Sequence, residues 1–196
     1  MNDDLRAALA PVADAFEVLG VDYRIGGSVA SSALGVGRST FDIDLVADLP
    51  RQHVDAFVAR LGEAYYADGD MIRDAVLRRS SFNVIHLATM MKLNIFILKH
   101  RSFDLAAFER VTRSPLGDED RIFPLTTAED IILHKLEWFR LGDGVSERQW
   151  HDILGVFRVQ AGALDRDYLE RWAGELGVAD LLQRARGQAG PPASRT

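Results

Sequence analysis

Two aspartates one residue apart, Asp42 and Asp44, are the side chains whose type and spacing point most directly to chemistry. They fall in Phe41 to Val46, where we expect a strand. Side chains on a strand alternate between its faces, so both carboxylates point the same way. Two carboxylates side by side on a rigid strand suit a divalent cation with hard oxygen ligands, such as Mg²⁺ or Mn²⁺. An isolated pair of this kind is more often the solvated face of an edge strand, so its context must decide.

A glycine turn, Gly26-Gly27-Ser28, lies upstream of the aspartates, between a predicted strand at Val21 to Ile25 and a predicted short helix at Ser28 to Leu34. Such a turn exposes backbone N–H groups at a helix N-terminus, where phosphate binds. The glycines allow close backbone approach, and Ser28 can cap the helix or contact a phosphate oxygen. The turn and the carboxylate strand together predict a phosphate site beside a metal site, which is the combination that nucleoside triphosphate chemistry needs.

The order Gly27-Ser28, helix, Arg38-x-Thr40-x-Asp42-x-Asp44 resembles the signature of the DNA polymerase β-like nucleotidyltransferase superfamily. Within it, the chain is most similar to the AbiEii-type group, the nucleotidyltransferase toxins of abortive-infection and toxin–antitoxin systems. The similarity continues downstream, reaching from about Tyr23 to about Leu154. The segments that resemble this group's lysine motif and its following aspartate motif are 129–136 and 146–154.

The resemblance implies a role for each matched residue. Asp42 and Asp44 would bind the metal and carry catalysis. Lys135 would contact the triphosphate, and Asp152 would complete the site or orient the lysine as a further catalytic residue. The nucleotide-binding residues would be Gly26, Gly27, Ser28, Arg38, Thr40 and Lys135.

The residues themselves support these roles in part. Lys135 lies on a largely apolar helix face beside Ile132 and Leu136, and an ammonium placed there needs an anionic partner. The alternative for Lys135 is a surface lysine that keeps its charged end in water. Asp152 lies four residues after Arg148, so a surface ion pair on one helix is its alternative.

One position departs from the family pattern. Superfamily members usually place a third carboxylate on a later strand, commonly after a lysine and an apolar residue, and the corresponding stretch here is Lys92-Leu93-Asn94. Asn94 can ligate Mg²⁺ through its carbonyl oxygen, but it lacks the charge and cannot act as a general base. Three outcomes stay open: a slow enzyme, an enzyme that uses Asp152 or another base, or a degenerate nucleotide-binding domain.

The function implied is a Mg²⁺-dependent nucleotidyltransferase that moves an NMP from an NTP to an acceptor. The acceptor would be an RNA 3′ end such as that of tRNA, a protein hydroxyl, or a small molecule such as an aminoglycoside. The protein would then be the toxin of a phage-defence or toxin–antitoxin system, with a cognate antitoxin as partner. The alternative is a non-catalytic nucleotide-binding or interaction module, which the neutral Asn94 favours.

Composition excludes several other classes. The 196 residues include no cysteine, which rules out disulfides, cysteine-ligated zinc, iron–sulfur clusters and a thiol nucleophile. The net charge of −6 argues against duplex DNA as a partner and weakly against RNA. No apolar run has the length of about 20 residues that a membrane span needs, and the acidic start does not resemble a signal peptide. We therefore expect a cytoplasmic protein without a membrane partner.

The periodicity of apolar residues predicts an α+β protein, with a mixed sheet flanked by helices and then a C-terminal helical module. The expected divisions are a catalytic core at 1–125, a helical module at 126–186 and a flexible tail at 187–196. We expect a polar loop at 114–120, and Thr126 with Glu129 as the capping box of the next helix. An aromatic and aliphatic stripe should form the core between this helix and the following one; its members are Trp138, Phe139, Leu141, Trp150, Ile153 and Phe157.

Overall fold

The computed structural model of the chain describes residues 3–37, 40, 42–116 and 121–190. It divides into two compact units. The first unit comprises Met1–Gly26 and Ser39–Leu125, and the second unit comprises Gly27–Arg38 and Thr126–Thr196. The segment that follows the glycine turn therefore groups with the C-terminal helices. The domain bounds expected from the sequence stay a prediction.

Within the described residues, the first unit carries a seven-stranded sheet with the strand order β3-β4-β5-β2-β1-β7-β6. The pairs β2–β5 and β1–β7 are parallel and the other pairs are antiparallel. This mixed sheet with flanking helices confirms the predicted fold class. The strands are β1 (Tyr23–Ile25), β2 (Asp42–Ala47), β3 (Tyr65–Tyr66), β4 (Ser81–His86), β5 (Met91–Ile97), β6 (Thr112–Ser114) and β7 (Phe123–Leu125).

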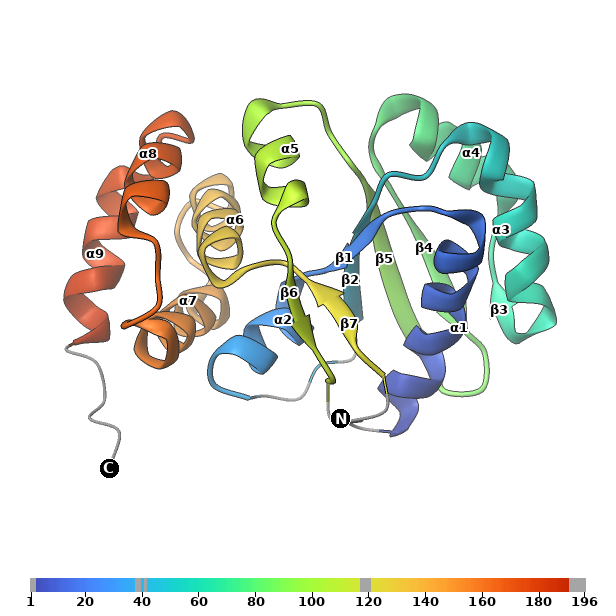
Figure 1. The fold of residues 1–196 in the computed structure, drawn as a ribbon, viewed down its shortest axis with the longest axis horizontal. Coiled ribbons are helices and arrows are strands. Elements are labelled where there is room, and N and C mark those ends of the chain that lie inside the picture. Colours follow the sequence, from blue (N-terminus) through green and yellow to red (C-terminus); the bar gives the residue numbers. More distant parts are fainter. Residues whose placement is uncertain (1–2, 38–39, 41, 117–120, 191–196) are drawn as a thin grey trace. The chain divides into compact units, whose positions relative to one another are not determined.

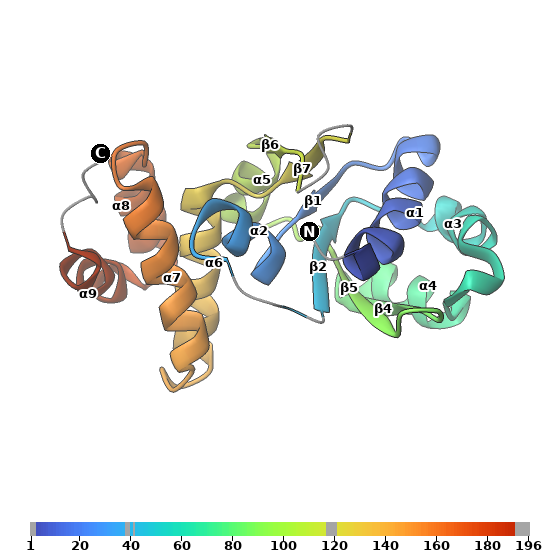
Figure 2. The same ribbon diagram turned by 90° about the horizontal axis from the view of Figure 1, so that it is seen from below.

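One face of the central strands is buried and apolar. On β2, Ile43 and Leu45 are fully buried, and their neighbours across the parallel ladder, Leu93 and Ile95, are buried as well. Two helices of the first unit, α1 (Asp3–Leu19) and α3 (Val54–Leu61), lie side by side in both Figure 1 and Figure 2. A ring on each of α1, α3 and β4 joins these elements into one core, with Phe16 stacked on Phe57, and Phe57 and Phe82 in a T-shaped contact. The strict alternation on β2 therefore leaves its opposite face for polar residues.

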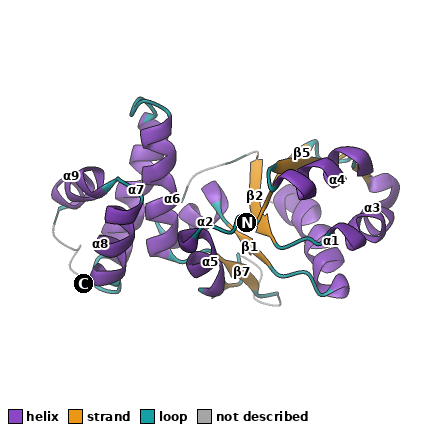
Figure 3. Ribbon diagram, turned by 90° about the horizontal axis from the view of Figure 1, so that it is seen from above, coloured by secondary structure: helices purple, strands orange, loops and turns teal. Residues whose placement is uncertain are grey.

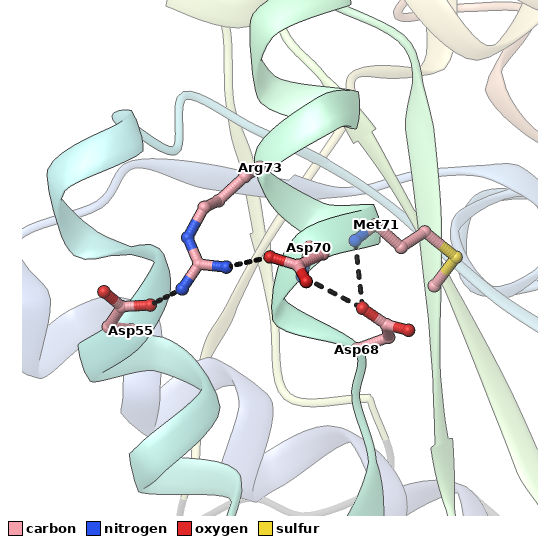
Figure 4. A network of polar contacts seen from close by, with 5 residues as sticks. All are labelled: Asp55, Asp68, Asp70, Met71 and Arg73. Atoms are coloured by element: carbon pink, nitrogen blue, oxygen red, sulfur yellow. Dashed lines mark hydrogen bonds and ion pairs between the residues drawn. The ribbon is translucent and has the colours of Figure 1, made fainter.

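The helices of the first unit are α1 (Asp3–Leu19), η1 (Arg51–His53), α3 (Val54–Leu61), η2 (Gly62–Ala64), α4 (Gly69–Arg78) and α5 (Ser102–Glu109). Charged side chains tie α3 to α4 at the surface, as Figure 4 shows. Arg73 of α4 contacts Asp55 of α3, and it donates to Asp70 at 2.6 Å. Asp68 caps α4 by accepting from the backbone N–H groups of Asp70 and Met71. This network fixes the start of α4 relative to α3.

The described part of the second unit contains helices and no strand, as Figure 3 shows by colour. Its central pair, α6 and α7, packs around Leu136, Ile153 and Val156, all fully buried. Ser146 caps α7 by accepting from the N–H of Gln149. The helices are α2 (Gly27–Leu34), α6 (Ala128–Leu141), α7 (Glu147–Gln160), α8 (Arg166–Glu175) and α9 (Ala179–Ala189).

Helix α2 approaches α7 closely because glycines occupy the point of contact. A Cβ atom on Gly35 would lie 2.9 Å from the backbone nitrogen of Val156, and a Cβ on Gly155 would lie 3.3 Å from the backbone nitrogen of Val36. The amide of Gln160 then donates to the backbone carbonyl of Leu34 at 2.8 Å. The second unit thus holds the helix that follows the glycine turn by backbone-to-backbone packing.

Three local expectations were wrong. The cap of α6 is Thr127, whose hydroxyl accepts from the N–H of Asp130, and not Thr126, because the helix begins one residue later than the Thr126 pattern requires. Residues 112–114 form the edge strand β6 and so include the start of the expected loop, because they pair with β7. Within the expected stripe, Trp138 and Leu141 are 52% and 69% exposed, so they do not belong to the core between the two helices. No helix among the described residues is long and apolar enough to cross a membrane.

Candidate nucleotide and metal site

Asp42 and Asp44 lie on β2, in the middle of the sheet, on the face opposite the phenylalanine core. The parallel ladder pairs Asp42 with Lys92 and Asp44 with Asn94 on β5. Paired residues on neighbouring strands share a face, so four polar side chains form one cluster of two aspartates, a lysine and an asparagine. Asp42 is exposed and Asp44 is half-buried, so both carboxylates remain accessible to a ligand.

Each aspartate has a partner on β5. The Asn94 Nδ2 donates to the Asp44 Oδ1 at 2.8 Å, and the Lys92 Nζ lies 3.6 Å from the Asp42 Oδ1. The Asn94 amide can present either its NH₂ group or its carbonyl oxygen. If the Asn94 amide group rotated by 180°, its carbonyl oxygen would become a neutral ligand beside Asp44. Asn94 therefore lies beside Asp44 on the same face of the sheet, and its role at a metal stays a prediction.

Lys92 was not among the site residues expected from the sequence, although Asn94, which lies on the same face of the strand, was. The signal was present in its spacing, because Lys92 and Asn94 are two residues apart on one strand. The register between β2 and β5 was the missing information, and it joins segments that are 50 positions apart in the chain.

The glycine turn begins beside Asp44. The Gly26 N–H donates to the Asp44 carbonyl oxygen at 2.9 Å, which continues the β1–β2 ladder by one step. Gly27 follows with a φ of +55°, in the left-handed region that favours glycine. Helix α2 then begins, with Gly27 and Ser28 half-buried. The chain therefore leaves the sheet at the level of the second aspartate.

Thr40 shapes the backbone at the start of β2. Its hydroxyl donates to the Asp42 carbonyl oxygen at 3.0 Å and accepts from the Asp42 N–H at 3.4 Å. The side chain thus fixes the local backbone from which the Asp42 carboxylate projects. Arg38, the other predicted phosphate contact in this segment, lies outside the described residues.

Lys135 and Asp152 lie in the second unit, on α6 and α7, and form a buried ion pair. The Lys135 Nζ and the Asp152 Oδ2 are 2.9 Å apart, and the two side chains are only 11% and 3% exposed. Neither surface alternative holds, because Lys135 does not extend into water and Asp152 is not an exposed partner of Arg148. Asp152 therefore contacts Lys135 directly, and the catalytic role of either residue stays a prediction.

The donor set at Asp42 and Asp44 can be compared with what Mg²⁺ requires. Among the described residues, no group of three or more His, Cys, Asp or Glu side chains is arranged to hold a metal ion. Mg²⁺ is usually bound through one or two carboxylates and completed by waters and substrate phosphates. Two carboxylates with an amide beside them therefore fit a Mg²⁺ ion that arrives with a nucleotide, and they do not form a closed structural metal site.

No protein-family model matches the chain, and no curated protein matches it either. Solved structures do. The antibiotic-resistance factor ANT(2'')-Ia is similar with a TM-score of 0.57 and 16% identity, over 97% of this chain and 100% of that one. The lincosamide antibiotic adenylyltransferase LnuA, in its lincomycin-bound structure, is similar with a TM-score of 0.51 and 18% identity, over 81% of this chain and 98% of that one. An antigenic nucleotidyltransferase-like protein from Paracoccidioides brasiliensis is similar with a TM-score of 0.52 and 18% identity, over 98% of this chain and 96% of that one.

These likenesses span nearly the whole of each neighbour, so they concern the complete arrangement and not one shared motif. Identities this low establish the fold and not the AbiEii-type group. The chain has the nucleotidyltransferase fold.

Proposed function

We propose that the protein is a Mg²⁺-dependent nucleotidyltransferase that moves an NMP from an NTP to a hydroxyl group of a small-molecule acceptor. The observation that carries the proposal is the pair Asp42 and Asp44, set on one face of β2, with Gly26 bonded to the backbone of Asp44. Two accessible carboxylates on one strand face suit the cation that accompanies a triphosphate.

In this mechanism, Asp42 and Asp44 would hold the Mg²⁺, which neutralises phosphate charge when it is bound. The N–H groups of Gly27 and Ser28 would bind phosphate oxygens. The acceptor oxygen attacks the α-phosphorus, a new P–O bond forms, and the bond to the β-phosphate bridge breaks, so that pyrophosphate leaves with the electron pair. Asn94 cannot take the proton of the acceptor hydroxyl, so the proton goes to an aspartate on the same face or to water.

Two observations support a small-molecule acceptor. Two of the similar structures are an antibiotic-resistance factor and an antibiotic adenylyltransferase bound to its antibiotic. The net charge of −6 opposes a long contact with an RNA backbone. A tRNA end or a protein hydroxyl would be the competing outcomes of an acceptor screen.

Calorimetric titration tests the site itself. ATP, CTP, GTP and UTP are titrated with Mg²⁺ into the protein and into the variant Asp42→Ala/Asp44→Ala. The matched control is Asp22→Ala/Asp48→Ala, which removes the same charge from two exposed positions at the opposite end of β1 and β2. The expected result is metal-dependent binding that only the Asp42→Ala/Asp44→Ala variant loses. The nucleotide that binds most tightly then identifies the preferred nucleobase. Equal loss in both variants, or no binding by a folded sample, contradicts the proposal.

The second candidate is a non-catalytic nucleotide-binding module, and Asn94 is the observation that favours it. A transfer assay with labelled NTP and a panel of acceptors separates the two functions once binding is shown. Transfer by the natural chain supports the enzyme. Transfer only by Asn94→Asp supports the module, because the added carboxylate then supplies what the natural chain lacks.

The AbiEii-type role, a toxin held by an antitoxin, stays a proposal with its own test. Expression of the chain in a bacterial host would slow growth, and Asp42→Ala would restore it at equal protein level. Slow growth that persists in Asp42→Ala would oppose a toxin that acts through this site.

A further inference from the structure

We propose that this site holds one divalent cation with its nucleotide where a two-metal arrangement would hold two, and that Lys92 is the residue that replaces the second ion. The inference rests on the proposed function, because it concerns the cation that accompanies the nucleotide. It assigns Lys92 a positioning role at Asp42.

The geometry of the cluster carries the inference. The Lys92 ammonium lies 3.6 Å from an Asp42 oxygen, on the same sheet face as both carboxylates. Asn94 donates its amide hydrogen to Asp44 at 2.8 Å and so takes up one oxygen of that carboxylate. Each aspartate therefore already has one oxygen directed at a group of β5.

The charge of the cluster points the same way. The two carboxylates and one ammonium of Asp42, Asp44 and Lys92 sum to −1, and Asn94 adds nothing. Two-metal sites hold their ions about 3.5–4 Å apart and need carboxylates to offset four positive charges. With Lys92 at ion-pair distance from Asp42 and a neutral side chain at position 94, the cluster carries too little negative charge to offset two divalent cations. The cation that the triphosphate brings would complete its shell with phosphate oxygens and water, which Mg²⁺ retains readily.

The experiment counts bound Mn²⁺ by electron paramagnetic resonance, with the α,β-methylene analogue of ATP or of the nucleotide that the titration selects. We expect one Mn²⁺ for each protein–nucleotide complex in the natural chain. In the double variant Lys92→Met/Asn94→Asp we expect two, with the exchange-broadened spectrum of neighbouring ions. This readout is independent of turnover.

A single substitution gives the direction of the Lys92 effect. Lys92→Met removes a partly exposed cation that competes with the metal for Asp42, so Mn²⁺ should bind about fivefold more tightly, which is the effect of one charge at about 4 Å in a water-like medium. Lys99→Met is the matched control, because Lys99 is an exposed lysine just after the same strand, and its removal should leave the affinity unchanged.

The outcomes separate the two levels of the proposal. Two Mn²⁺ ions in the natural chain overturn the one-cation inference and leave the proposed function standing. One ion in the folded double variant also overturns it, because positions 92 and 94 would then not set the number. Unchanged or weaker binding in Lys92→Met overturns the role of Lys92. No Mn²⁺ or nucleotide bound by the natural chain removes the proposed function itself.

Discussion

Lys135 and Asp152 offer a substitution series in which stability and nucleotide binding should separate. Their ion pair is buried within the second unit, with 2.9 Å between the charged atoms. A structural lysine and a triphosphate-binding lysine both explain its burial. The series consists of Lys135→Met, Asp152→Leu and the combined variant, in which two apolar side chains of similar length replace the pair.

The size of the effect follows from burial. At 2.9 Å the attraction is about 6 kcal/mol for an effective dielectric constant of about 20, against a desolvation cost of several kcal/mol for each ion. The intact pair therefore contributes little net stability, whereas removal of one partner costs about 3–5 kcal/mol in the free energy of unfolding. The loss for Lys135→Met should lie at the upper end of this range, because the variant leaves the Asp152 carboxylate, which is 3% exposed, without the Lys135 ammonium. Asp152→Leu should lie at the lower end, because a lysine stem can bend its charge toward water.

The combined variant decides between the two roles. Its unfolding free energy, measured by urea denaturation, should return to within about 1.5 kcal/mol of the natural chain, because an apolar pair replaces an ionic one. If Lys135 also contacts the triphosphate, the same variant should bind the nucleotide about ten- to a hundredfold more weakly, since a hydrogen bond to a charged group contributes about 1.5–3 kcal/mol. A stable combined variant with unchanged nucleotide affinity would refute the assignment of Lys135 to the nucleotide.

Two further predictions concern stability alone. Gly35→Ala should lower the free energy of unfolding by about 1–3 kcal/mol, because its Cβ would lie 2.9 Å from the Val156 nitrogen, while Gly37→Ala, whose Cβ meets nothing within 4 Å, should change it by less than about 0.5 kcal/mol; equal effects in urea denaturation would contradict the close helix contact. Burial raises the pKa of Tyr23 and of Tyr65 above the ordinary tyrosine value, so the folded state keeps both protons and its stability is lost as the pH rises above 10. Each should contribute a slope of about 1.4 kcal/mol per pH unit there, and each Tyr→Phe variant should remove its share of that slope between pH 10 and 11.5.

Local patterns predicted much of the fold. Apolar periodicity predicted the α+β class. The two β-rich runs 82–87 and 92–98, joined by four residues, predict a hairpin or adjacent strands, and β4 and β5 pair there in antiparallel fashion, because such signals lie within a short window. The edge strand β6 was not predicted because its three residues become a strand only by pairing with β7. The cap of α6 was wrong by one position because Thr126 and Thr127 are both good caps, and only the helix start distinguishes them.

Sequence spacing predicted the candidate site less completely than it predicted the fold. The alternation on one strand put Asp42 and Asp44 on the same face, and it did so independently of every other element. The contacts of Lys92 with Asp42 and of Lys135 with Asp152 depend instead on a strand register and on a helix pairing. Those arrangements are set by tertiary packing, which no short window of sequence contains.

The neutral side chain at position 94 has a consequence for the fold as well as for the chemistry. A carboxylate there would face Asp44 at hydrogen-bond distance, and two like charges so close repel by at least about 1 kcal/mol even with water-like screening. Asn94 replaces that repulsion with a donated hydrogen bond, so the first unit gains a contact at this point where a third carboxylate would depend on a cation for relief. The same substitution removes the charge that a second cation needs. At this one position, a residue that stabilises the metal-free protein therefore weakens metal binding, and the reverse also holds. Asn94→Asp should lower the free energy of unfolding in the presence of a chelator, and Mn²⁺ with nucleotide should restore it.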